Sequence, residues 1–117
     1  MTFFEEGCLL RILIGENIQH KGKPLYEWLV LKARESGLAG ATVMKGVMGY
    51  GANSRIHTSK ILRLSEDLPV IIEIVDSKDN LETFLKEVDD VIEVGLATLE
   101  KADVRFYRHK GQIAGGR

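Results

Sequence analysis

Glycines and basic side chains gather in one acid-free stretch, Gly37–Leu64, which is the part of the chain best suited to anion chemistry. The stretch contains no Asp or Glu, and three of its glycines surround Tyr50. Backbone amides at a glycine-rich turn, together with cationic side chains, can hold an anion such as a phosphate. We therefore interpret it as the sensing loop of a small nucleotide-binding module. The glycines around Tyr50 are Gly46, Gly49 and Gly51, and the basic residues of the stretch are Lys45, Arg55, His57, Lys60 and Arg63.

Charge is segregated along the chain although the net charge is only −1. The segment from Glu66 to Asp103 holds twelve acidic and three basic residues. Arg105 and Arg108 follow in a segment without acids. Two basic segments thus flank an acidic one, which indicates a local anion site rather than a generally basic surface.

Length and composition predict one globular domain over residues 1–117, with its core in residues 7–108 and a flexible tail at residues 109–117. The single Cys8 excludes an internal disulfide, and it opens an apolar run, so we expect a packed structural thiol. No apolar run is long enough to cross a membrane, and the N-terminus is acidic where a signal peptide is basic. These features predict a cytoplasmic protein.

Apolar periodicity predicts regular elements in the order β-α-β-β-α-β, with the first two strands separated by a helix between Pro24 and Gly37. A second helix is expected from a cap at Asp76 or Ser77 to Gly95. The predicted strands are residues 8–14, 41–48, 70–75, 96–99 and, as a short extra candidate, 104–108.

This order predicts a ferredoxin-like α+β fold, an antiparallel sheet with two helices on one face. Residues 8–14 and 70–75 are the central neighbours in that topology, and each is apolar on both faces. An uncovered apolar sheet face implies a partner surface, for which self-association is the economical explanation. Arg11 and Glu73 are expected to pair across the two central strands.

Two stretches resemble the PII signalling superfamily. GLAGATVMKGVMGYG resembles its second strand, in which Gly-Phe-Gly leads into the long T-loop, and IIEIVDSKDNLETFL is similar to its third strand and second helix. More narrowly, residues 7–108 resemble the PII-like uncharacterised protein family 166, also called domain of unknown function 190. The matching stretches are GKPLYEWLV, GLAGATV, GYGANSRIHTSK, LSEDLPVIIEIVD and VRFYRH. The resemblance implies a PII-like homotrimer.

The resemblance also implies an adenine nucleotide, of the ATP, ADP or AMP class, in clefts between subunits. Carried over by position, Gly49, Tyr50 and Gly51 match the turn from strand to T-loop. Ala52 and Asn53 stand where PII proteins have Arg-Gln, so that only their backbone amides would reach phosphate. Arg105 and Arg108 lie near the terminal basic pair of the superfamily.

Two departures from the PII pattern concern phosphate recognition. GLATLEKAD replaces the second phosphate loop and lacks its second glycine, and Ile71 stands in place of a lysine. Arg55, His57 and Lys60 are candidate replacements. The tyrosine that is modified in the PII T-loop has no counterpart, because Tyr50 lies at the base of the loop.

These considerations predict a non-enzymatic regulatory protein in which nucleotide binding orders a loop and so changes the surface shown to a partner. Lys45 would add long-range attraction. The predicted nucleotide-binding residues are Gly46, Gly49, Tyr50, Gly51, Ala52, Asn53, Arg55, His57, Lys60, Arg105 and Arg108.

Other functions remain as alternatives. A ligand-free interaction module could regulate a membrane transporter, by analogy with relatives. An RNA-binding ferredoxin-like domain is less favoured because the central strands CLLRILI and VIIEIV carry no stacking aromatics. Catalysis by Glu16, His20 and His57 lacks a motif, and His20, His57, His109 and Cys8 lack metal-ligand spacing.

Overall fold

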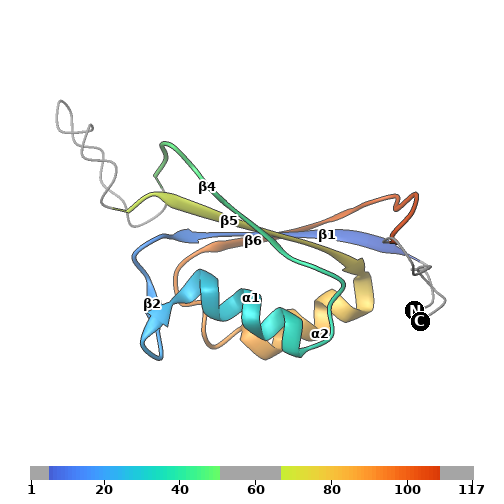
Figure 1. Cartoon of the computed structure of the whole chain (residues 1–117), viewed down its shortest axis with the longest axis horizontal. Helices are drawn as coiled ribbons and strands as arrows, with labels where there is room; N and C mark the ends of the chain where they lie inside the picture. The colour runs from blue at the N-terminus through green and yellow to red at the C-terminus, as the bar shows by residue number, and fades with distance from the viewer. Residues whose placement is uncertain (1–5, 51–66, 109–117) are drawn as a thin grey trace.

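A four-stranded antiparallel sheet with two helices on one face forms the body of the molecule (Figure 1). The computed structural model describes residues 6–50 and 67–108. The strand order is β4-β5-β1-β6, so the ferredoxin-like prediction is confirmed. The elements are β1 (Gly7–Gly15), β2 (Gln19–His20), β3 (Lys23–Pro24), α1 (Leu25–Glu35), β4 (Thr42–Lys45), β5 (Pro69–Ser77), α2 (Lys78–Val88) and β6 (Leu96–Lys101).

Strands β1 and β5 are central neighbours, as predicted, and pair over nine residues from Gly7 opposite Ser77 to Gly15 opposite Pro69. Alternate residues of both strands point to the helices, because side chains in a strand alternate between the two faces. The β-branched residues that are frequent in β5 suit such a packed sheet. The buried residues on the helix-facing side are Cys8, Leu10, Ile12, Ile14, Val70, Ile72, Ile74 and Asp76.

Helix α1 begins directly after Pro24, whose φ of −56° suits the start of a helix. It buries Leu25, Leu29 and Ala33 against the sheet. Its end is set by Gly37, which has a φ of +83° that a residue with a side chain rarely adopts. The amide of Gly37 donates to the Arg34 carbonyl at 3.0 Å, which completes the predicted C-terminal cap.

Helix α2 begins at a cap on Ser77, whose hydroxyl accepts a hydrogen bond from the Asn80 amide at 3.2 Å. It ends at Val88, earlier than the predicted limit at Gly95. The Val88 carbonyl then accepts from the amides of Val91 and Ile92 in a turn, and both of these residues still pack on the core. The apolar periodicity of the sequence therefore extends beyond the end of the helix, which is why the predicted end lies too late.

Three further details differ from the prediction. The polar loop before α1 contains a small hairpin, β2–β3, whose connecting residues Lys21 and Gly22 both have positive φ. Strand β4 is shorter than predicted and β6 is longer, reaching Lys101. Residues 102–108 are described but form no regular strand.

The sheet face turned away from the helices is apolar around a charged centre. Leu9, Leu13 and Ile71 lie on this open face on the two central strands, and Met44 and Leu96 extend it onto the edge strands. Arg11 and Glu73 sit opposite each other at its centre and form an ion pair at 2.9 Å, as predicted. In the described part of the chain, no helix is both long and apolar enough to span a bilayer.

Candidate functional site

Strand β4 ends at Lys45 beside the start of β5 at Pro69. The chain between these two strands includes the segment 51–66. The Gly46 amide donates to the Pro69 carbonyl at 2.7 Å, extending the β4–β5 pairing. The turn after β1 supports the other side, since the Glu16 amide donates to the Leu68 carbonyl at 2.9 Å. The Asn17 amide donates to Asp67 Oδ1 at 3.0 Å. These contacts define the loop base, residues 46–50 and 67–69.

Close packing explains why two residues of the loop base are glycines. A Cβ on Gly46 would lie 2.7 Å from Cγ of Pro69, and one on Gly49 would lie 2.9 Å from the same atom. Real Cβ atoms essentially never come that close to another heavy atom. Both glycines thus allow the chain to pack closely against the Pro69 ring. The sequence predicts only their backbone amides as phosphate ligands and does not indicate this packing role.

Lys45 is held by a carboxylate next to the loop base. Its Nζ lies 2.6 Å from Oε2 of Glu16, in the turn after β1. The hydrogen bond and the charge of Glu16 raise the pKa of Lys45 above 10.5, outweighing a small opposite effect of burial. Lys45 is therefore an ion-pair partner in this structure, and its predicted long-range attraction of an anion is partly offset by Glu16.

The outer part of the loop base is exposed and apolar. The exposed fraction of Val47 is 91%, that of Met48 is 64% and that of Tyr50 is 72%. Large exposed apolar side chains in one short segment are typical of a contact surface. The loop base therefore offers an aromatic ring and aliphatic groups beside the backbone amides.

The second group of predicted residues lies in the arm, residues 102–108, which follows β6. Arg105 and Arg108 are both exposed there. Arg105 pairs with Asp103 at 3.6 Å, and the Arg108 guanidinium lies 4.4 Å from the centre of the Phe106 ring. Phe106 itself is 66% exposed. The arm thus presents two cations and an aromatic ring together.

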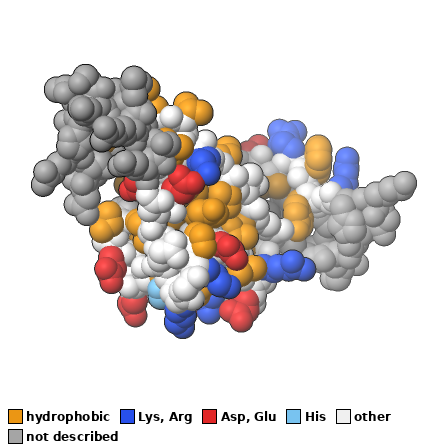
Figure 2. Space-filling model, turned by 60° about the vertical axis from the view of Figure 1, so that its left-hand side comes forward, with side chains coloured by type: hydrophobic (Ala, Val, Ile, Leu, Met, Phe, Trp, Pro, Cys, Tyr) orange, Lys and Arg blue, Asp and Glu red, His pale blue; other side chains and the backbone are white. Residues whose placement is uncertain are grey.

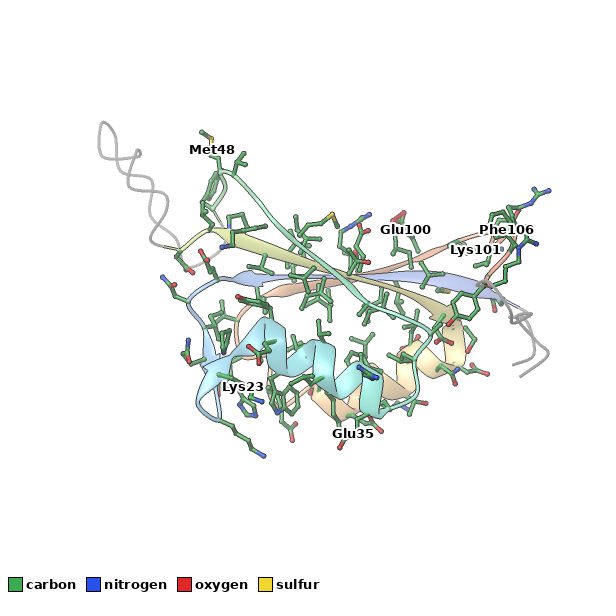
Figure 3. All side chains as sticks on the ribbon, in the orientation of Figure 1. Lys23, Glu35, Met48, Glu100, Lys101 and Phe106 are labelled. Atoms are coloured by element: carbon green, nitrogen blue, oxygen red, sulfur yellow. The ribbon has the colours of Figure 1, made fainter. Side chains whose placement is uncertain are left out.

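The loop base and the arm lie at opposite ends of the sheet. Figure 3 places Met48, in the loop base, far from Lys101 and Phe106, at the arm. In the strand register, Lys45 pairs with Val70, which pairs in turn with Ile14 of β1. Lys101 pairs with Cys8 at the other end of β1. Six residues of strand separate those two levels, a distance of about 20 Å. Within one chain the structure does not bring the two groups together.

Six of the predicted nucleotide-binding residues lie outside the described residues. So do the predicted tail, residues 109–117, and two of the three histidines weighed for catalysis or metal binding. His20, the third, contacts the Trp28 ring edge-on with ring centres 4.7 Å apart. The six undescribed nucleotide-binding residues are Gly51, Ala52, Asn53, Arg55, His57 and Lys60.

Charges of both signs are interspersed on the face of the molecule that Figure 2 shows. Figure 2 shows Lys and Arg side chains among Asp and Glu side chains, separated by hydrophobic ones. Among residues 6–50 and 67–108, no three His, Cys, Asp or Glu side chains gather closely enough to hold a metal ion. The face drawn in Figure 2 therefore carries charges of both signs rather than an extended basic field.

Two residues relevant to the candidate site were not predicted. Glu16 was considered only as a catalytic acid, although it is the partner of Lys45. The sequence places Phe106 in a candidate strand, whereas its exposed ring lies against Arg108. The only signal in the sequence is the run of basic and aromatic residues at 104–108, and the Val, Phe and Tyr of that run are also residue types that strands favour.

Sequence relatives support the family resemblance. The family model DUF190, described as Uncharacterized ACR, matches residues 7–104. A UPF0166 protein of Aquifex aeolicus (strain VF5) is 41% identical over 98 residues, which cover 84% of this chain and 92% of the relative. A UPF0166 protein of Methanocaldococcus jannaschii is 37% identical over 84 residues, or 72% of this chain and 77% of the relative.

Solved structures support the fold. CPII from Thiomonas intermedia K12, a nitrogen regulatory PII-like protein, matches in its complex with ADP and bicarbonate with a TM-score of 0.62 and 17% identity. Its complex with ADP, AMP and acetate matches with a TM-score of 0.61 and 14% identity. Each match covers 85% of this chain and 88% of CPII. With the family model and the relatives, these matches confirm the resemblance: the chain belongs to the DUF190 (UPF0166) family and has a PII-like fold.

Proposed function

We propose that this protein is a non-enzymatic, PII-like regulator that binds an adenine nucleotide between the subunits of a homotrimer. It would act in the cytoplasm. Nucleotide binding would order the loop between β4 and β5 and thereby change the surface offered to a partner protein. A membrane transporter is one kind of partner to test.

The observation that carries the choice of ligand is the fold match to CPII, which was solved with ADP and with AMP. The chain itself supplies groups suited to such a ligand. Exposed arginines at the arm can form charge-assisted hydrogen bonds to phosphate. The exposed rings of Tyr50 and Phe106 can stack on a base.

The separation of the two groups supports a site between subunits. The loop base and the arm are about 20 Å apart along the strands of one chain, too far to touch one nucleotide phosphate chain together. In a cyclic trimer, each interface joins two different surface patches, one from each neighbouring copy. The loop base of one copy could then face the arm of another.

The open sheet face supports the same assembly. It exposes apolar side chains on all four strands, including Met44 at 40%, Val75 at 37% and Leu96 at 56%. A second copy would cover this surface. The arginine–glutamate pair at its centre is already satisfied within one chain, so that covering it would leave neither charge unpaired.

Titration calorimetry with ATP, ADP, AMP and cyclic nucleotides tests the proposal. The measurement is repeated with Arg55→Ala and Gly51→Val, which remove a predicted phosphate contact and fill the predicted amide turn. We expect binding of at least one nucleotide by the unmodified protein and weaker binding by both variants. Absence of binding by all four would rule out the sensor function and favour a ligand-free interaction module.

A further inference from the structure

The arm, residues 102–108, is attached to the body of its own chain at its root. The Ala102 amide donates to the Gly7 carbonyl at 3.0 Å. A Cβ on Gly7 would lie 2.6 Å from the Ala102 carbonyl oxygen and 2.9 Å from Cγ2 of Val104. The first residues of the arm therefore pack directly against the backbone of Gly7, and this contact fixes the point at which the arm leaves the sheet.

A second attachment lies near the far end of the arm. The hydroxyl of Tyr107 donates a 2.8 Å hydrogen bond to the carbonyl of Ala39, in the connection between α1 and β4. This bond is partly buried and joins residues 68 positions apart in the chain. The arm is thus held at both ends, at Gly7 and at Ala39.

The carbonyl that accepts this bond belongs to a firmly held residue. The Ala39 amide donates to Oδ2 of Asp76 at 2.8 Å, and Asp76 is only 2% exposed. The other carboxylate oxygen of Asp76 accepts from the Ser77 amide at 2.7 Å and from Nδ2 of Asn80 at 2.9 Å. Tyr107 is therefore bound, through Ala39, to the junction of β5 and α2 rather than to a loose loop.

The two attachments determine which side chains of the arm face outward. Ala102, Val104 and Tyr107 are partly buried. Arg105, Phe106 and Arg108 are exposed, and they lie on both sides of the Tyr107 attachment. A backbone fixed in advance loses less conformational entropy when its arginines close on a ligand, so attachment of the arm favours binding.

We propose that Tyr107 is a positioning residue, whose hydroxyl bond to Ala39 holds Arg105 and Arg108 ready for the phosphate groups of a nucleotide. The ligand in this statement rests on the proposed function, whereas the attachment itself does not. Tyr107 itself would not contact the phosphate groups. Its hydroxyl acts only by fixing the arm.

The test compares Tyr107→Phe with Ser36→Ala. The first change removes only the hydroxyl. The second removes another long-range side-chain hydrogen bond, from Ser36 Oγ to Glu87 Oε1 at 3.0 Å, which joins the end of α1 to α2. Two quantities are measured for each variant: the rate of amide hydrogen exchange in residues 102–108, and the affinity for ADP by calorimetry.

We expect faster exchange in the arm for Tyr107→Phe and unchanged exchange there for Ser36→Ala. Loss of one hydrogen bond that holds the arm should weaken ADP binding about three- to tenfold. In a background carrying Arg105→Gln and Arg108→Gln, Tyr107→Phe should add no further loss. A merely structural role would lower thermal stability without this dependence on the arginines.

Unchanged exchange in the Tyr107→Phe arm would overturn the proposal, whatever the protein binds. If the unmodified protein binds ADP and Tyr107→Phe binds it with equal affinity, the proposal is also overturned. An equal loss of affinity with and without the two arginines would also overturn it. If the unmodified protein binds no ADP, the proposed function fails, and the role of Tyr107 toward phosphate fails with it, while the exchange rates separately decide the attachment.

Discussion

Arg11 and Glu73 stand directly opposite each other on β1 and β5; Nε of Arg11 donates to Oε2 of Glu73 at 2.9 Å, and Nη2 lies 2.9 Å from the same oxygen in an ion pair. Arg11 also reaches Glu100 on β6 at 3.4 Å. The charged group therefore spans three adjacent strands at the centre of the open apolar face. Its energetic importance depends on what covers that face.

Arg11→Met tests whether a second copy covers the open face. In a covered face the substitution leaves Glu73 unpaired away from water, which should weaken assembly by about 3 kcal/mol, or roughly a hundredfold. The double variant Arg11→Met/Glu73→Met removes both charges and should regain most of that loss. Sedimentation equilibrium measures both. If the face stays in water, each change should be below about 1 kcal/mol, which would contradict assembly through it.

Gly49→Ala tests the packing of the loop base on Pro69. The added methyl group would collide with Cγ of Pro69, so we expect a loss of about 1–2 kcal/mol in the free energy of unfolding. Pro69→Ala removes that atom and should relieve most of the loss in the double variant. Gly40→Ala is the matched control, because a Cβ there meets nothing within 4 Å. A loss that persists without the Pro69 ring would show that packing is not the reason for the glycine.

Asp76→Ala tests the buried carboxylate that joins the α1–β4 connection to α2. The change leaves the amides of Ala39 and Ser77 without their acceptor, and we expect it to cost about 3 kcal/mol in chemical denaturation. Asp79→Ala, on the exposed side of the first turn of α2, should cost no more than about 1 kcal/mol through the helix dipole. Similar losses for the two variants would contradict a special role for Asp76.

The Lys45–Glu16 pair predicts a pH dependence of stability at alkaline pH. The folded protein raises the pKa of Lys45 above 10.5, so folding favours the protonated lysine. The contribution of the pair is then complete below about pH 10.5 and is lost as the pH rises through the raised pKa. The difference in unfolding free energy between the unmodified protein and Lys45→Gln should be constant near neutral pH and shrink in that alkaline range. In a Glu16→Gln background, a pH-dependent difference of the same size would refute the pairing.

Sequence reasoning succeeded where a residue's surroundings are set by its own strand or helix. The central position of β1 and β5 followed from the predicted order of helices and strands, and the pairing of Arg11 with Glu73 followed from that adjacency. The cap at Gly37 followed from the end of an apolar helical stripe. Each of these inferences required only local periodicity and one strand order.

Features that depend on tertiary contacts between distant parts of the chain could not be predicted from the sequence. Lys45 meets Glu16 only because β4 docks beside β5 at the level of the turn after β1, and neither residue carries a local signal of that contact. The sequence predicts a short strand at residues 104–108, whereas the structure shows no regular strand there. The position of the arm is set instead by its attachment at Gly7 and Ala39, which no pattern of strand pairing could indicate.

Mixed assemblies test the central claim, that one nucleotide site is built from the β4–β5 loop with its loop base in one copy and from the arm of another. Arg55→Ala damages the loop side of every site in its own homotrimer, and Arg105→Gln/Arg108→Gln damages the arm side. When the two proteins are refolded together, each mixed trimer should contain one interface with both sides undamaged. Calorimetry with ADP should then recover about one site of unmodified affinity per mixed trimer. A mixture that binds ADP no better than its two parents would contradict a shared site.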